Sequence, residues 1–396
     1  MSLHSTLETI EAQDCLLTLR RVEGPQAREL FFSCQPAETA GPDEQARFVY
    51  QAIADFLETE GGSLESVVTE TIFLRNHSEV EPIRAARARV LAERKGLPHR
   101  PARTEIEQPP LNGANLEVLI HAVLPNASPL QLDSFEAETN CSCRECARSH
   151  GLSIRVGGED RLVAGGLYGA GENAYDQTHA MFEVAEKLLH QAGMEFSDVM
   201  RTWIYLPEME RDYADFNRAR REFFESRGID PVPASTGIGA GLIPPEHDVC
   251  LGVYAVKSDP PIQRIVMTTP TLNEAPEYGS DFSRGMRVEE SNRVSLFVSG
   301  TASLDETGET VYVNDFEGQA RRMLLNVEAL LKEQGASFSD VVSAITYLKH
   351  TEDAQRLREI FQEAGYEGFP NVLVEAPVCR PELLCETELL AVLPRN

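Results

Sequence analysis

The amino-acid sequence predicts an α+β fold built from three tandem units, each a mixed β-sheet with two helices on one face. The main observation is a stretch of 30 residues that occurs three times and superposes without a gap. Its copies begin at Gln45, Gln177 and Gln319. Each copy follows the same order of helix, glycine turn and strand. Three such copies in one chain predict an internal pseudo-threefold, the covalent counterpart of a homotrimer.

The first helix of each unit opens the repeated stretch. In the second copy, apolar residues between Met181 and Leu189 recur at three- and four-residue steps, the pattern of one face of an amphipathic helix. A glycine then ends the helix in the left-handed conformation that favours this residue. These glycines coincide in the three copies, at Gly61, Gly193 and Gly335.

The remaining elements also recur in each unit. A β-rich strand follows the glycine turn, as at 344–348. A second helix is expected at 79–91, 213–224 and 353–361. Each unit closes on a strand that ends in Ala-Val, at 122–123, 255–256 and 391–392. A strand with small residues at its end precedes the first helix, at 31–34, 162–166 and 296–300.

These repeats divide the chain into three units. We place the units at residues 1–127, 151–258 and 285–396. A Cys-rich linker at 128–150 and a second linker at 259–284 are expected to join them. The expected molecule is a monomer with an internal pseudo-threefold.

The composition limits the classes of function. The chain has 396 residues and a net charge of -27, so a phosphate backbone would be repelled and nucleic acid is not an expected partner. A few local arginines can still attract a small anion. The start has no signal-peptide pattern, and no apolar run is long enough to cross a bilayer. The expected location is the cytoplasm, with no membrane partner.

The repeated unit resembles the YjgF/RidA family, also called the Rid or endoribonuclease L-PSP family. Its members are small subunits of this α+β design, and their trimers place active sites between subunits. They typically deaminate reactive enamines and imines with an arginine that holds the substrate carboxylate and a glutamate near the final strand. In the first unit, the segment PARTEIE gives Arg103 for the arginine, and the glutamate falls on Glu117.

The other two units keep only part of this pattern. The second unit has Ser235 at the arginine position and Cys250 near the glutamate position. The third unit has Asn371 where arginine is expected but keeps Glu386. The resemblance therefore implies a complete deaminase pair in the first unit alone.

Roughly the second half of the chain also resembles the chorismatases. The likeness rests on YADFNRAR at 213, PASTGIG at 233, FSRG at 282, SGTAS at 299 and CRPELLCE at 379. Chorismatases are fused units of the same superfamily that remove the enolpyruvyl side chain of chorismate. The resemblance implies that Glu386 and Cys379 belong to the catalytic motif, with Cys379 shaping the product. It also implies that the first unit is an addition to the usual layout.

The segment VCRPELLCE, at 378–386, suits this chemistry. Cleavage of an enol ether needs a proton on the vinyl carbon, and a carboxylic acid with a raised pKa can supply it. Glu386 begins an apolar strand, where partial burial would raise its pKa. Arg380 can hold a carboxylate in a bidentate fork, although a solvated turn arginine explains it equally well. Cys379 has no histidine nearby in the sequence to activate it as a nucleophile.

Further residues are candidates for binding a small anionic carboxylate. Tyr213 and Arg220 share one face of a helix, and Arg284 belongs to the FSRG segment. The end of the SGTAS strand could present backbone N–H groups to an anion. The residues of that strand end are Ser299, Gly300 and Thr301.

The Cys-rich segment suggests a metal site. Cys141, Cys143, Cys146 and His150 supply three thiols and an imidazole, which could hold a structural zinc ion in tetrahedral geometry. A linker with incidental thiols is the alternative. No redox cofactor is implied.

Three functions remain open at this point. The first is a chorismatase-like lyase or hydrolase that uses Glu386 as its acid. The second is an imine deaminase, a hydrolase, at Arg103 and Glu117. The third is a non-catalytic pseudo-trimer that binds a small molecule. We expect an enzyme, with the chorismatase-like activity first.

Overall fold

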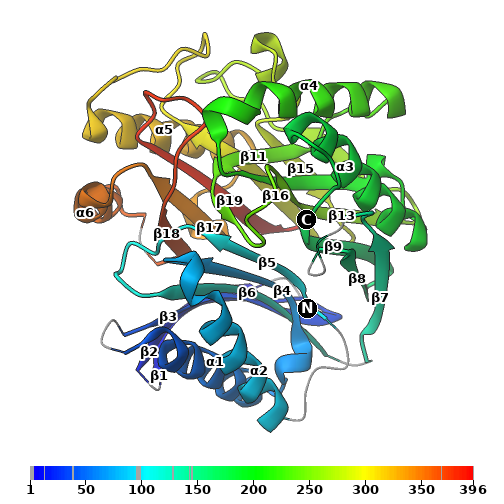
Figure 1. Cartoon of the computed structure of the whole chain (residues 1–396). Helices are drawn as coiled ribbons and strands as arrows, with labels where there is room; N and C mark the ends of the chain where they lie inside the picture. The colour runs from blue at the N-terminus through cyan, green and yellow to red at the C-terminus, as the bar shows by residue number, and fades with distance from the viewer. Residues whose placement is uncertain are drawn as a thin grey trace.

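The fold consists of three mixed β-sheets that meet at their inner faces, with helices on the outside (Figure 1). The computed structural model describes residues 4–12, 14–37, 40–94, 100–126, 129–141, 143, 146–366 and 368–395. Each sheet corresponds to one of the predicted units, so the predicted α+β pseudo-trimer is confirmed. No helix in these ranges is long and apolar enough to cross a membrane.

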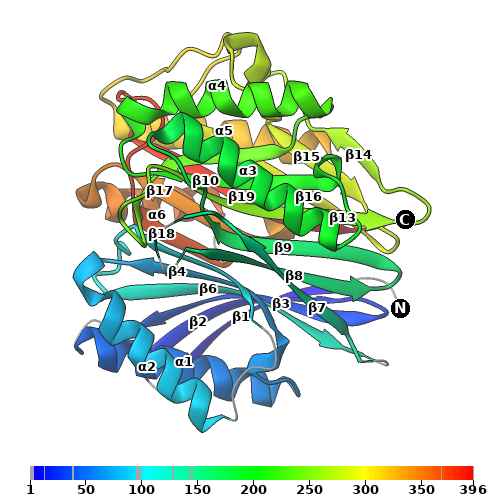
Figure 2. The same ribbon diagram turned by 45° about the vertical axis from the view of Figure 1, so that its right-hand side comes forward.

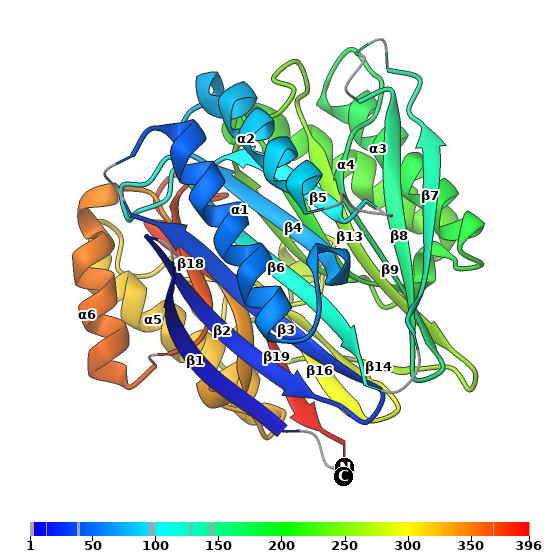
Figure 3. The same cartoon turned by 90° about the horizontal axis from the view of Figure 1, so that it is seen from below.

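The first sheet has the strand order β1-β2-β3-β6-β4-β5-β12. Its strands are β1 (His4–Ala12), β2 (Cys15–Glu23), β3 (Ala27–Pro36), β4 (Val67–Leu74), β5 (Ala102–Glu107), β6 (Leu116–Pro125) and, from the second unit, β12 (Gly241–Leu242). Helices α1 (Pro42–Thr59) and α2 (Val80–Glu93) lie across its outer face (Figure 3). Buried apolar side chains of α1, from Ala46 to Leu57, pack on the sheet.

The second sheet has the order β11-β10-β13-β9-β8-β7. Its strands are β7 (Gln131–Glu138), β8 (Arg148–Val156), β9 (Glu159–Leu167), β10 (Val199–Leu206), β11 (Ala234–Gly239) and β13 (Cys250–Ser258). Helices α3 (Ala174–Gln191) and α4 (Met209–Arg227) run side by side over it (Figure 2).

The third sheet has the order β14-β15-β16-β19-β17-β18. Its strands are β14 (Gln263–Val266), β15 (Gly285–Glu289), β16 (Arg293–Ala302), β17 (Val341–Leu348), β18 (Asn371–Glu375) and β19 (Cys385–Pro394). Its helices are α5 (Phe316–Glu333) and α6 (Ala354–Ala364). Short 3-10 turns lie at Leu64–Ser66, His77–Glu79, Phe196–Asp198, Ala275–Tyr278, Phe338–Asp340 and Thr351–Asp353.

The strand registers show that the three units are equivalent. The strand after the first helix pairs antiparallel with the closing strand of its unit. The matching pairs are Phe73 with Glu117, Tyr205 with Cys250, and Tyr347 with Glu386. The positions aligned in the sequence as glutamate, cysteine and glutamate therefore occupy the same place in each sheet.

Both segments expected as linkers contribute strands. Strand β7 lies within 128–150 and pairs with β8, while β14 lies within 259–284 and pairs with β15. Each is an edge strand with few buried side chains. Such strands carry only a weak hydrophobic pattern, which explains why the sequence did not reveal them.

A buried ionic network joins the three units. Oε1 of Glu29, in the first unit, lies 2.9 Å from Nη1 of Arg161 in the second unit and 2.6 Å from Nη1 of Arg293 in the third. Arg161 also pairs with Glu290 of the third unit at 2.9 Å. Because removal of one partner would leave an uncompensated buried charge, these contacts fix how the sheets meet.

Candidate active site

A cavity of about 870 Å³ lies between the second and third units, and we call it the Glu386 cavity. Helix α4 and strand β11 form one wall, and β16, β19 and the loop before β19 form the other. It brings together seven residues that the sequence predicted for one site: Tyr213, Arg220, Arg284, Gly300, Cys379, Arg380 and Glu386. These residues are far apart in the chain, so the meeting of the two units creates the site.

Glu386 is placed by the start of strand β19, a central strand of its sheet. It lies opposite Tyr347 on β17 and Ala302 on β16, and its side chain is 4% exposed. Burial, followed by the nearby Glu388 carboxylate, raises the pKa of Glu386 to about 8. Nearby arginines only partly offset this effect. The carboxyl is therefore protonated at neutral pH and can donate a proton.

The strand beside Glu386 is bulged. The pairing of β16 with β19 shifts register between Val298 and Thr301, which inserts one extra residue. A Cβ atom at Gly300 would lie 1.9 Å from Oε1 of Glu386. Only glycine therefore lets the bulge approach the carboxyl this closely.

The backbone N–H groups of the bulge are used inside the protein. The Ser299 N–H donates to the Arg284 carbonyl at 3.0 Å, and the Gly300 N–H donates to the Thr236 hydroxyl at 2.8 Å. Ser299 and Thr301 are buried and do not line the cavity. The prediction that Ser299 and Gly300 offer N–H groups to an anion is therefore wrong, because these groups fix the bulge instead.

Three arginines are oriented along the cavity by neutral oxygen atoms. Arg220 donates to the Asn217 side chain at 2.6 Å. Arg284, which is 2% exposed, donates to the Asn273 carbonyl at 2.9 Å. Arg380 donates to the Gly308 carbonyl at 2.8 Å. These hydrogen bonds fix the direction of each guanidinium along the cavity.

The cavity is positive although the whole chain is acidic. Its lining holds five arginines, at 218, 220, 221, 284 and 380, and the two glutamates Glu210 and Glu386. Arg218 and Arg221 pair with the neighbouring Asp215 and Asp281, which leaves three arginines against the two glutamates. Since Glu386 is protonated at neutral pH, the local charge favours an anion. The ring of Phe282 lies close to two of the guanidinium groups. Its centroid is 5.9 Å from the guanidinium carbon of Arg220 and 5.7 Å from that of Arg284.

Cys379 lines the cavity as a neutral thiol. Burial, followed by the neighbouring Glu386, raises the pKa of Cys379 to about 12. The lining contains no histidine. A thiol in this state is a poor nucleophile, so its position suits a role in shaping the cavity.

The sequence did not reveal the role of Glu388, which lies near Glu386, or the residues that hold Glu388 in place. Glu388 accepts hydrogen bonds from Arg201 at 2.8 Å and from the Trp203 indole at 2.7 Å. Its negative charge helps to keep Glu386 protonated. The alternation of side chains along a strand could have indicated that Glu388 lies near Glu386, because residues 386 and 388 of β19 point to the same face of the sheet.

A second cavity, of about 400 Å³, lies between the first and second units, and we call it the Arg103 cavity. Helix α2 and strand β5 line it as α4 and β11 line the Glu386 cavity. It contains arginines 84, 87, 100, 103 and 148. In the second unit, the strand position equivalent to Glu386 is Cys250, which does not line this cavity. Burial raises the pKa of Cys250 to about 12.

Arg103 and Glu117 do not share a cavity. Arg103 lines the interface with the second unit. Glu117 accepts a hydrogen bond from Asn112 at 3.0 Å, and the charge of Arg358, on helix α6 of the third unit, acts to lower its pKa. Each unit thus presents its arginine position to one neighbour and its glutamate position to the other. The predicted Arg103–Glu117 pair is therefore not formed within the first unit.

The predicted zinc ligands converge only in part. Cys141 and Cys146 have their Sγ atoms 3.1 Å apart. The imidazole beside them belongs to His247, and the predicted ligand His150 instead lies 2.7 Å from Arg100. Residue 150 is part of strand β8, whose pairing with β7 directs it away from the loop. Cys143 contributes backbone contacts to both neighbouring sulfurs.

Comparison with known proteins agrees with the repeated fold. The family model "Endoribonuclease L-PSP" matches residues 33–124, 161–257 and 273–393. A RutC family protein of Pyrococcus abyssi is 38% identical over 98 residues, which cover 24% of this chain and 76% of that protein.

Longer matches include two enzymes from Streptomyces. A 3-hydroxybenzoate synthase of Streptomyces hygroscopicus is 29% identical over 305 residues, which cover 71% of this chain and 87% of that protein. A chorismatase of Streptomyces rapamycinicus is 28% identical over 262 residues, which cover 58% and 72% respectively.

A solved chorismatase structure shares the fold, with a TM-score of 0.59 and 19% identity over 83% of this chain and 93% of that one. This coverage exceeds what residues 128–396, about two thirds of the chain, could provide. The likeness therefore reaches into the first unit, so at least part of this unit is not an addition to the chorismatase fold. Because the family model matches all three units, the chain belongs to the endoribonuclease L-PSP (YjgF/RidA) family, as three tandem copies.

Proposed function

We propose that this protein is a chorismatase-type enzyme that removes the enolpyruvyl group from chorismate, or from a closely related small carboxylate, by proton donation from Glu386. The observation that carries the proposal is a buried, protonated carboxyl in an arginine-lined cavity between two units. The names of the two Streptomyces relatives, a 3-hydroxybenzoate synthase and a chorismatase, support an enzyme that acts on this class of substrate.

The arginines provide the binding part of the proposal. Chorismate carries two carboxylates, one on the ring and one on the enolpyruvyl group. Arg220, Arg284 and Arg380 are distributed along the cavity and can bind both groups through charge-assisted hydrogen bonds. In this arrangement, the enolpyruvyl group lies toward Glu386.

Glu386 provides the chemical part. Its carboxyl proton passes to the terminal methylene carbon of the enol ether, and the C=C electron pair forms the new C–H bond. An oxocarbenium ion and the Glu386 carboxylate result, and the new negative charge stabilises the positive one. Water then adds to the oxocarbenium carbon and returns a proton to Glu386. The hemiketal breaks down to pyruvate and a ring alcohol.

The pKa of Glu386 sets the expected pH dependence. Because burial raises this pKa to about 8, the acid form predominates at lower pH. As pH rises through about 8, the carboxyl loses its proton and can no longer donate it. We therefore expect kcat/KM to fall above about pH 8 as a single group of the free enzyme ionises. Initial rates of pyruvate release, measured at chorismate concentrations well below KM over a series of pH values, would show this decrease.

The test is turnover of chorismate by the purified protein, with pyruvate and the ring product measured by mass spectrometry. We expect pyruvate from the wild type and from the exposed control Glu333→Gln, and a large loss in Glu386→Gln. The ring product distinguishes hydrolysis from aromatisation. Absence of pyruvate from a folded wild-type sample, or an unchanged rate in Glu386→Gln, would contradict the proposal. Chorismate binding without turnover would support a non-catalytic binding protein instead.

A further inference from the structure

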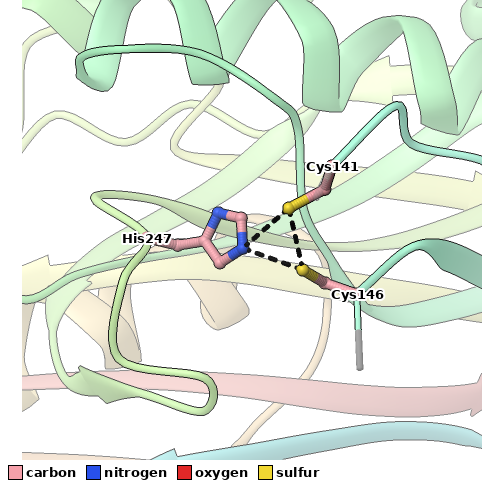
Figure 4. Close-up of side chains that lie close together, drawn as sticks. All are labelled: Cys141, Cys146 and His247. Atoms are coloured by element: carbon pink, nitrogen blue, oxygen red, sulfur yellow. Dashed lines mark hydrogen bonds between the residues drawn. The ribbon is translucent and has the colours of Figure 1, made fainter. Parts of the chain in front are cut away.

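Two thiols and an imidazole converge in the second unit, outside the Glu386 cavity (Figure 4). Cys141 and Cys146 lie in the loop between β7 and β8, and His247 lies in the loop before β13. From this convergence we propose that Cys141, Cys146 and His247 bind a structural zinc ion. The site differs from the one predicted from the sequence, because His247 takes the place of His150.

The three ligand atoms have the spacing of a common coordination shell. Nε2 of His247 lies 3.0 Å from Sγ of Cys146 and 3.7 Å from Sγ of Cys141. The two sulfur atoms are 3.1 Å apart, too far for a disulfide bond. Ligands at about 2.3 Å for Zn–S and about 2.0 Å for Zn–N lie roughly 3.5–3.8 Å from one another in a tetrahedron. Entry of the ion requires the closer atoms to separate by roughly half an ångström.

The loop that carries the thiols is built around them. The Thr139 N–H donates to the Ala147 carbonyl at 3.1 Å, which closes the hairpin. The Thr139 hydroxyl donates to the Cys146 carbonyl at 2.6 Å and accepts from the Cys141 N–H at 3.1 Å. The Cys143 N–H points at Sγ of Cys141, 3.4 Å away.

His247 is held with its Nε2 atom toward the thiols. Its side chain is 6% exposed, and its ring centroid lies 4.5 Å from that of Tyr168. Within the described ranges, Nδ1 of His247 has no hydrogen-bond partner, so the sulfurs are the polar contacts of this ring. Sulfur is only a weak partner for a hydrogen bond. Burial of an imidazole for such contacts alone is unfavourable, whereas a metal ion would account for it.

The ligand chemistry identifies the metal. Two thiolates and one imidazole form a soft set that suits zinc rather than magnesium or calcium. Binding would release the thiol protons to solvent as the two Zn–S bonds form. The fourth position would be taken by water or by the thiol of Cys143, whose backbone already contacts both sulfurs.

The ion would stabilise the interface between the first and second units. His247 follows the β12 segment, in which Gly241 and Leu242 pair with β5 of the first sheet. Cys146, Ile243 and Pro244 all line the Arg103 cavity. The metal would thus connect the β7–β8 loop to the segment that crosses between units. This role is structural and does not depend on the activity proposed for Glu386.

The test is the zinc content of the full-length protein, purified under reducing conditions without chelators, by inductively coupled plasma mass spectrometry. We expect about one zinc per chain. Cys146→Ser and His247→Ala should lower the content at least about tenfold. Cys34→Ser, which alters a buried thiol elsewhere, and His150→Ala should retain it. Zinc retained in His247→Ala but lost in His150→Ala would overturn the assignment.

A second measurement covers variants that fail to fold. Zinc is removed from the wild type by chelation and replaced by Co²⁺, and the absorption spectrum is recorded. We expect a thiolate-to-cobalt charge-transfer band and the intense visible bands of tetrahedral cobalt, together with a lower Tm for the chelated protein. A wild type without zinc and without these bands would overturn the proposal. Loss of two hydrogens on a peptide that links Cys141 and Cys146 would also overturn it, because a disulfide would then explain the cluster.

Discussion

The Glu386 cavity and the Arg103 cavity lie at equivalent interfaces between consecutive units. One is bordered by α4 and β11, and the other by α2 and β5. At the equivalent strand position, however, the first has Glu386 and the second has Cys250. At the equivalent position of the neighbouring unit, the first has Ser235 and the second has Arg103. Two interfaces of one repeated fold thus offer similar cavities that differ in the residues at their equivalent positions.

The arginines of the two cavities are paired in part in the same way. In the Arg103 cavity, Arg84 pairs with Glu105 at 2.7 Å, and Arg87 pairs with Glu70 at 2.6 Å. In the Glu386 cavity, Arg218 pairs with Asp215 at 2.8 Å, and Arg221 pairs with Asp281 at 3.0 Å. The difference between the two cavities therefore lies in the residues at the equivalent strand positions.

The largest expected effect comes from the acid itself. Glu386→Gln keeps the side-chain shape but removes the transferable proton, so kcat for pyruvate release should fall by about 10²- to 10⁴-fold. Glu117→Gln makes the same change at the equivalent strand position of the first unit and should leave kcat unchanged. Equal losses in the two variants would remove the distinction between the interfaces. Circular dichroism of both variants would establish that they are folded.

Gly300→Ala should have the next largest effect. The new methyl group would lie 1.9 Å from Oε1 of Glu386, so the carboxyl must move from its place beside the substrate. A displacement of about 1 Å can cost about 10²-fold in rate. We expect kcat to fall by this order. Gly41→Ala, where the nearest atom to a new Cβ is 3.5 Å away, is the matched control and should retain its activity.

Arginine substitutions distinguish the cavities in binding. Arg380→Ala removes a charge-assisted contact worth about 1.5–3 kcal/mol, so KM for chorismate should rise about 10- to 100-fold. Arg103→Ala alters the other cavity and should leave KM unchanged. Steady-state kinetics of the two variants would test this. A larger rise of KM in Arg103→Ala than in Arg380→Ala would indicate that chorismate binds at the interface between the first and second units.

The smallest effect concerns stability. Burial raises the pKa of Glu117 to about 8 from its ordinary value of 4.5. The folded chain therefore holds this proton more tightly than the unfolded chain, and the free energy of unfolding falls as pH rises from 4.5 through 8. Glu117→Gln should reduce this fall, as measured by urea unfolding at several pH values. An unaltered pH dependence would show that Glu117 ionises normally.

Much of this account could be predicted from the sequence because the repeat is gapless. Outside the gapless stretch, alignment of the three closing strands on their Ala-Val ends gives the equivalent positions of Glu117, Cys250 and Glu386, and the structure places them in equivalent registers. The convergence of Arg220, Arg284 and Arg380 on Glu386 followed from motif resemblance, since no local pattern indicates contacts across such distances in the chain.

The remaining features depend on how the units meet. Arg103 and Glu117 face different neighbours, which no reading of one unit alone could reveal. His247 approaches Cys146 across about 100 residues, whereas His150 was chosen because it is near in the sequence. The hydrogen bond that the Gly300 N–H donates to the Thr236 hydroxyl likewise joins two units. Local patterns predict elements well, but they carry little information about contacts between units.

The most direct test of the central claim is a crystal structure of Glu386→Gln with chorismate, since this variant should bind the substrate without converting it. The account predicts density for one molecule in the Glu386 cavity, with its carboxylates on Arg284 and Arg380. The methylene carbon should lie about 3–3.5 Å from the amide that replaces the carboxyl. Ordered chorismate in the Arg103 cavity, with the Glu386 cavity empty, would contradict the claim.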